Sequence, residues 1–431
     1  MAAGWMDLSG GKQLLQQVQW LKSFGVRYEV AVTGLSLPLV MMTAAMGAVA
    51  CWASYGIKQS PRGYFALLLW ATAAAIGSLV LQDFFMAAAA TVALVVIIYF
   101  LAAGWGTDRR IPAARRFLYF GIAGMAAAIA GMAVIDRAGA AASSTWYWLA
   151  IAGFGALMAV VPLHLWLADL LAESATPVGI LVVSLVQTAG AYGILHAVHA
   201  TAAEKIPTIL VANDATLGWI GLAVAAYSAL SAMGQKDLMR LAANLSVAQM
   251  GFFLIGIASG AAATEGAGFL LVTHGISAGM TVYVCGMIRE RVGHCEIDRL
   301  GGLAAHMPAF AGWSAVGVLG MVGVPGLCGF VGEMLVIMGI FARPTSASDS
   351  MEHAVLLGVS GIAVMAILIG IGVWMYQRVY LGSPRPEHSN VARMSLSERW
   401  ILAVLGIAVV GLGIMPMLVT EVMRGAADIG K

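Results

Sequence analysis

Apolar segments of about twenty residues recur along this chain from residue 30 almost to its C-terminus. A helix of that length crosses the roughly 30 Å of hydrocarbon in a bilayer. Of the 431 residues, 61% are hydrophobic and only 10% are charged, and a soluble domain could not bury so much apolar surface. A membrane β-barrel would show short alternating segments instead. We therefore predict an all-α, polytopic membrane protein.

We predict about twelve membrane spans joined by short polar connections. The spans are expected to begin near Val30, Gly63, Phe84, Phe117, Trp146, Pro177, Thr216, Leu241, Glu265, Ala309, His353 and Trp400.

Residues 1–29 are a polar arm ahead of the first span, and they lack the basic-then-apolar start that is typical of a cleaved signal peptide. Leu14, Val18 and Leu21 would share one face of a helix. A helix lying in the membrane interface and a solvated arm are both open for this segment. Residues 30–431 are predicted to form a single transmembrane domain.

Basic residues predict the orientation of the spans. Fifteen of the 23 Lys and Arg residues lie in connections that follow odd-numbered spans, and eight lie on the opposite side with both termini. Because basic connections resist translocation, the odd-numbered connections are expected to face the cytoplasm. We therefore expect an inner-membrane protein with both termini in the periplasm.

Two spans contain a proline where the helix should break. Pro162 lies in "GALMAVVPLHLWLADLLAESATP", and Pro325 lies in "MVGVPGLCGFVGEM". Each would fall in the fifth span of a set of five, which is typical of a transporter built from two repeats with interrupted helices. We place the first repeat at about 30–175, the second at about 177–343 and C-terminal helices at about 353–422. Ordinary proline kinks are the alternative.

Acidic and basic side chains are rare inside the spans, where a charge is strongly disfavoured. His274 lies deep in the ninth span, Glu333 follows the second break, and His164 follows the first. Histidine titrates near neutral pH and burial favours the neutral form of a carboxyl group, so His274 and Glu333 could pass a proton between them. Side chains that could hold water beside them are Ser246, Gln249, Thr273 and Ser277. The alternative is a neutral core histidine and a protonated or ion-paired glutamate.

Other chemistry finds little support in the sequence. The four cysteines have no CxxC spacing, and no metal-ligand pair lies deep within one span. The glycines lie in apolar segments and form no phosphate-binding loop. A net charge of +2 without a basic stripe argues against nucleic-acid binding.

Several motifs together resemble one family. "VPLHLWLADLLAESATPVGILV", "SALSAMGQKDLMRLAANLSVAQMGFFLIGI", "THGISAGMTVYVCGMI" and "GVPGLCGFVGEMLVIMGIF" follow one another as in the antiporter-like membrane subunits of respiratory complex I and of multisubunit cation/proton antiporters. With "TGLSLPLVMM" and "YFLAAGWG", the likeness extends from residue 33 to about 420 and is strongest to the chain M type of NADH-quinone oxidoreductase. The resemblance implies two inverted five-helix repeats, each with a broken helix, and a line of buried charges along the membrane.

The family's charged positions are unevenly kept in this chain. The resemblance places a glutamate and three lysines of the family at positions that are here apolar or neutral: Val92, Leu157, Thr188 and Met239. The family's histidine and terminal glutamate match His274 and Glu333. The N-terminal half-channel is thus degenerate, and a proton crossing it would have to pass a dehydrated core without titratable groups.

Three functions stay open. The chain is a proton-conducting subunit of a complex I-like NADH-quinone oxidoreductase, a structural relative of such a subunit with impaired or lost translocation, or part of a cation/proton antiporter or a proton-coupled inorganic-carbon uptake complex. We favour a complex I-like assembly with impaired or lost pumping. The chain has no catalytic site of its own, so flavin, iron-sulfur clusters and quinone are expected in partner subunits, and its own partners are membrane subunits and lipid.

Overall fold

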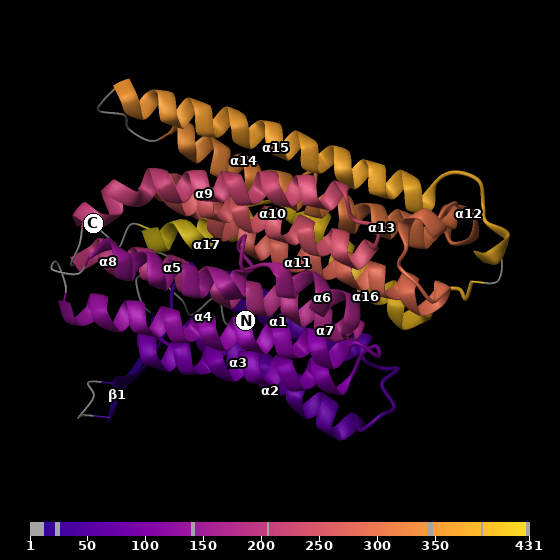
Figure 1. Ribbon diagram of the computed structural model, residues 1–431, viewed down its shortest axis with the longest axis horizontal. Coiled ribbons are helices and arrows are strands. Elements are labelled where there is room, and N and C mark those ends of the chain that lie inside the picture. The colour runs from indigo at the N-terminus through magenta and orange to yellow at the C-terminus, as the bar shows by residue number, and fades with distance from the viewer. Residues whose placement is uncertain are drawn as a thin grey trace.

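The computed structural model describes residues 13–21, 26–138, 143–204, 207–342, 348–388 and 391–427. In this part of the chain the helices run roughly along one axis as a bundle, with a small hairpin at its margin (Figure 1). Ten helices are long and apolar enough to cross a membrane. Two further spans are each split into two shorter helices, which brings the total to the predicted twelve.

The segment predicted as the first repeat holds α1 (Ser36–Ala53), α2 (Pro61–Val80), α3 (Phe84–Gly104), α4 (Arg110–Ala138) and the split pair α5 (Ser144–Met158) and α6 (Leu165–Glu173). The segment predicted as the second repeat holds α7 (Thr176–Leu181), a π-helical turn (Val182–Val186) and α8 (Gln187–Glu204), then α9 (Pro207–Met233), α10 (Leu238–Ala258) and α11 (Ala261–Val292). The short α12 (Leu303–His306) and the split pair α13 (Pro308–Met321) and α14 (Cys328–Phe341) complete it. The last helices are α15 (Ser348–Tyr380), α16 (Leu396–Ile414) and α17 (Met417–Ala427).

Burial separates the central helices from the peripheral ones. The apolar windows of α10 and α11 are entirely buried, whereas those of α2 and α3 are one-third buried. Long α15 lies along the outside of α9 and α14 (Figure 1). A helix that is apolar all round but largely exposed must meet lipid or another membrane protein, so the exposed side chains of α2, α3 and α15 fit a bilayer.

An interfacial helix, one of the two alternatives for residues 1–29, is wrong for the described part of that segment. Gln13–Leu21 (β1) pairs antiparallel with Val26–Val32 (β2). β2 reads VRYEVAV, in which β-branched valines favour an extended strand over a helix. For the same reason the first span begins at Ser36 rather than near Val30. The backbone N–H of Gln82 donates to the backbone carbonyl of Glu29 at 2.9 Å, which places the hairpin beside the α2–α3 connection.

Close helix crossings depend on glycine. A Cβ atom on Gly251 of α10 would lie 2.6 Å from the Ala225 amide nitrogen and from the Gly221 carbonyl oxygen of α9. Small residues let helix backbones approach in this way where the hydrophobic effect between helices is weak. By contrast, nothing lies within 4 Å of the corresponding position on Gly370 of α15.

We predict that Gly251→Ala lowers the melting temperature of the detergent-purified chain, because α9 and α10 must move apart to admit the methyl group. Gly370→Ala is the matched control, and it should leave the melting temperature unchanged or raise it slightly, since alanine is the better helix former by about 1 kcal/mol. Equal melting temperatures for the two variants would contradict the crossing.

Candidate proton site at the helix breaks

Each split span ends its first half with a backbone carbonyl that receives a glutamine side chain. Gln187 Nε2 donates to the carbonyl of Met158, the last residue of α5, at 3.1 Å. Gln249 Nε2 donates to the carbonyl of Met321, the last residue of α13, at 2.8 Å. Carbonyls at a helix C-terminus have no partner within the helix, and inside a membrane they need one from elsewhere in the protein. The two breaks are therefore stabilised in the same way.

From Gln187 a hydrogen-bonded chain leads to His274. The Ser246 hydroxyl donates to Gln187 Oε1 at 2.6 Å, and its oxygen lies 3.3 Å from His274 Nε2. Because the only hydroxyl proton of Ser246 points to Gln187, the serine must accept from the histidine ring. His274 is then the Nε2–H tautomer. Each hydrogen bond of the chain is donated in the same direction: His274 donates to Ser246, Ser246 to Gln187, and Gln187 to the carbonyl of Met158.

His274 keeps its other ring nitrogen free. It is 2% exposed, and its Nδ1 is buried without a hydrogen-bond partner among the described residues. In the tautomer above, Nδ1 carries a lone pair and is the atom that could take up a proton. Next to it on α11, the Gly275 carbonyl accepts the Ser184 hydroxyl of the π-helical turn at 2.6 Å.

The second amide holds Glu333. Gln249 Nε2 donates its other proton to Glu333 Oε1 at 2.6 Å. The glutamate is fully buried, and its Oε2 has no partner in the described structure, as is also true of Gln249 Oε1. Buried polar atoms are nearly always satisfied by protein or water, so these two oxygens mark a polar spot beside the break.

One turn of α10 joins the two groups. Ser246 and Gln249 are three residues apart on this fully buried helix, so they share a face. The predicted residues His274, Glu333, Ser246 and Gln249 thus meet in one place. Ser277 and Thr273 are also buried on α11, but the Thr273 hydroxyl donates to the Leu270 carbonyl of its own helix.

His164 does not join this group. It directly precedes α6, and its ring packs edge-on against Tyr227 of α9 with ring centroids 5.5 Å apart. Tyr227 is half exposed, whereas His164 is 8% exposed and its Nδ1 has no hydrogen-bond partner in the described structure.

The corresponding centre of the first repeat is apolar. Leu157 is fully buried and Val92 packs against the same core. The other two positions, Thr188 of α8 and Met239 of α10, lie in the second repeat and are each 1% exposed. In the described part of residues 26–186, His164 is the only buried acidic or basic side chain.

The role of Gln187 was not predicted from the sequence. The residue stood out only as a neighbour of Thr188, because the resemblance points to a lysine position there. A signal was present, since a proline break in a membrane helix demands a donor for the freed carbonyl. Gln187 is one of only five Asn and Gln residues between the two prolines.

We predict that ¹⁵N NMR of the histidine-labelled chain in lipid shows His274 protonated on Nε2 and bare on Nδ1 at neutral pH. Ser246→Ala removes the acceptor and should weaken this tautomer preference, while Ser277→Ala, at a buried serine one turn beyond His274, should not. A resonance of His274 protonated on Nδ1 in the unmodified chain would contradict the direction of the hydrogen-bonded chain.

The carboxyl group of Glu333 is packed against the second break. Gly323 has a φ of +75°, and a Cβ atom there would overlap the carboxyl group of Glu333. Gly326 has a φ of +91°, but nothing lies within 4 Å of its Cβ position.

We therefore expect Gly323→Ala to destabilise the chain more than Gly326→Ala. Both substitutions place alanine in left-handed backbone, which costs about 1–2 kcal/mol, so the difference between their melting temperatures reports the clash with Glu333. In a Glu333→Ala background the difference should shrink. A difference that is unchanged in that background would show that the carboxyl group is not the obstacle.

Comparison with known proteins places this geometry in a family. Residues 111–359 match the family model described as NADH:quinone oxidoreductase/Mrp antiporter, transmembrane. NAD(P)H-quinone oxidoreductase chain 4 from a Synechococcus species is 30% identical over 95% of this chain and 80% of its own length. The chain 4 protein of a Nostoc species is 28% identical over 96% of this chain and 79% of its own length.

Solved structures share the fold. A chain of the Mrp complex from a Dietzia species has a TM-score of 0.82 at 19% identity, with 99% of this chain and 88% of that chain covered. A chain of respiratory complex I from Thermus thermophilus has a TM-score of 0.80 at 21% identity, with 98% and 90% covered. The chain belongs to the NADH:quinone oxidoreductase/Mrp antiporter family of membrane proteins.

Proposed function

We propose that this chain is a membrane-arm subunit of a complex I-like NAD(P)H-quinone oxidoreductase and that it no longer moves protons across the membrane by itself. The names of its relatives support the assembly. Flavin, iron-sulfur clusters and quinone then belong to partner subunits, since no motif for them occurs in this chain. Membership of an Mrp-type antiporter or a carbon-uptake complex is the alternative, and the shared fold alone does not distinguish it.

One observation carries the loss of translocation: the polar chain from His274 ends at the amide of Gln187 and the Met158 carbonyl. An amide donates through nitrogen and accepts through oxygen, and it does not exchange these roles at low energy. It therefore cannot hand on a proton as a hydroxyl or an imidazole does. Leu157, which precedes Met158, and Val92, which packs against the same core, accept no proton.

The second repeat nevertheless keeps a place for a proton. His274 Nδ1 and Glu333 Oε2 are buried atoms that can each bind one. Among the described residues of the first repeat no carboxylate, lysine or arginine is buried, so the state of this site has no electrostatic partner in the core there, and coupling of a few kcal/mol needs nearby charges in a low dielectric. We infer a locally exchanging site that is disconnected from the opposite face.

The finer location is also a proposal. We place the chain in an inner, cytoplasmic membrane with both termini on the periplasmic side. The excess of basic residues in the odd-numbered connections supports this orientation. The contact of the N-terminal hairpin with the α2–α3 connection is consistent with it, because that connection follows an even-numbered span.

We predict that Glu333→Gln leaves both quinone reductase turnover and proton yield unchanged when the whole complex is reconstituted in vesicles. The matched control is Glu352→Gln, at an exposed position near the start of α15. Co-purification of the partner subunits establishes assembly for both variants. A proton yield that falls with Glu333→Gln but not with the control would show that this chain pumps.

A further inference from the structure

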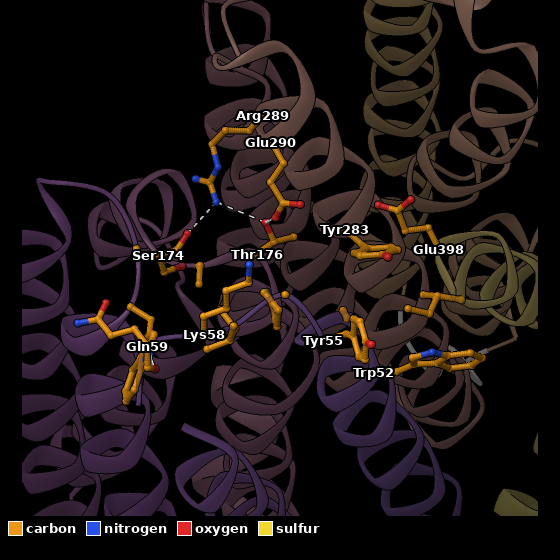
Figure 2. Close-up of a pocket in the computed structure, with 18 of the residues that line it drawn as sticks. Trp52, Tyr55, Lys58, Gln59, Ser174, Thr176, Tyr283, Arg289, Glu290 and Glu398 are labelled. Atoms are coloured by element: carbon orange, nitrogen blue, oxygen red, sulfur yellow. Dashed lines mark hydrogen bonds between the residues drawn. The ribbon is translucent and has the colours of Figure 1, made fainter. Parts of the chain in front are cut away.

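A polar cavity of about 660 Å³ lies at one end of the bundle, away from the proton site. Its walls come from the end of α1, the α1–α2 and α3–α4 connections, the α6–α7 junction, the end of α11 and the start of α16 (Figure 2). These are connections after odd-numbered spans, the side that carries most of the basic residues. The proposed function assigns no ligand to this cavity.

Hydrogen-bond donors gather on one wall of the cavity. Figure 2 shows Lys58, Ser174 and Arg289 around the same space. The exposed Lys58 has no hydrogen-bond or ion-pair partner among the described residues. Ser174 is 1% exposed, and its hydroxyl is buried without a partner in the described structure.

Arg289 is held in place and keeps donors to spare. Its guanidinium donates to the carbonyls of Ala172 at 2.5 Å and Ser174 at 2.8 Å, and to Thr176 Oγ1 at 3.5 Å. A guanidinium has five N–H donors, so two remain. An arginine fixed in this way offers an oxyanion a positive charge in a defined place, with single N–H donors on Nε and Nη1.

Two carboxylates also line the cavity, and neither removes its positive character. Glu398 is ion-paired with Arg291 at 2.6 Å. Glu290 accepts the Thr176 hydroxyl at 3.1 Å, beside Arg289. Three basic side chains line the cavity against these two acids, one of which is already paired: Lys58, Arg110 and Arg289. A singly charged phosphodiester suits this balance better than a doubly charged phosphate.

The surface below the cavity mouth is apolar. Along α1, Met41 is 65% exposed and Trp52 is 43% exposed, and Tyr55 just beyond the helix is 89% exposed. Ala45 and Ala48 are exposed between them at spacings of three and four residues, so these side chains form one stripe along the helix. Tryptophan and tyrosine at the end of an apolar stripe are typical of the headgroup level of a membrane.

We propose that this cavity binds the headgroup of a membrane phospholipid, with its phosphodiester held by Lys58, Arg289 and Ser174 and its acyl chains lying along the α1 stripe. The polar cavity alone would fit any small phosphate. The continuous apolar stripe selects an amphiphile. Basic pockets between helices on the cytoplasmic side of membrane proteins are suited to anionic headgroups.

The test is native mass spectrometry of the full chain, delipidated in detergent and titrated with dioleoylphosphatidylglycerol. Lys58→Ala and Ser174→Ala should each weaken lipid binding about five-fold, as expected for one lost charge or hydrogen bond. Lys58→Arg should restore it. Lys236→Ala removes another exposed lysine, from the α9–α10 connection on the same side, and should bind as the unmodified chain does.

Three outcomes decide the proposal. Equal binding by Lys58→Ala and Lys236→Ala, with unchanged melting temperatures, would overturn it. Inorganic phosphate serves as the second probe, and Lys58-dependent binding of phosphate as tight as that of the lipid would replace the lipid with a soluble phosphate ligand. Lipid binding that depends on Lys58 and exceeds phosphate binding supports the headgroup site.

Discussion

The structure depends on how a membrane protein satisfies backbone carbonyls where a helix is interrupted. Pro162 and Pro325 stop α5 and α13 inside the apolar bundle, and each leaves a last carbonyl without an intrahelical partner. In water such a group would be solvated at little cost, but in hydrocarbon it must find a donor. Gln187 and Gln249 supply that donor in the first and second broken span. The rest of the polar interior is arranged around these two amides.

The two glutamines differ in the other hydrogen bonds that their side chains make. Gln249 uses both of its N–H groups, one for Met321 and one for Glu333, so the second break is directly joined to an ionisable group. Gln187 presents its oxygen to Ser246 and thereby fixes the tautomer of His274 at the far end. The first break is therefore joined to the same site only through an acceptor that cannot pass a proton onward. A glutamine side chain therefore binds the last carbonyl of the first helix at both breaks, but only Gln249 also binds an ionisable side chain directly.

The sequence was sufficient to predict the spans and the breaks because both follow from strong local terms. Apolar length decides whether a segment spans, and proline decides where a helix stops, so the number of spans and the positions of α5 and α13 were predicted correctly. The hairpin was missed because Leu14, Val18 and Leu21 fit a helical face, and only the pairing of β1 with the valine-containing strand β2 decides against a helix. The resemblance identified His274 and Glu333. In the structure these residues of α11 and α14 contact Ser246 and Gln249, which lie on one turn of α10. The direction of the hydrogen bonds could not be predicted, since it depends on which side-chain atoms face each other across helices.

Retention of His274 and Glu333 in a chain with an apolar first repeat has a structural explanation. Removing one partner of a buried polar group leaves the other unsatisfied, which costs more than the net gain of the original hydrogen bond. Glu333 accepts from Gln249, and Ser246 accepts from His274, so loss of either ionisable group would leave a buried donor without its acceptor or the reverse. In the first repeat, Leu157 belongs to the hydrophobic core and Val92 packs against it, and neither side chain has a polar atom that needs a partner, so no such penalty applies to them. Both polar residues therefore help to hold a helix break together, and this role does not depend on proton translocation.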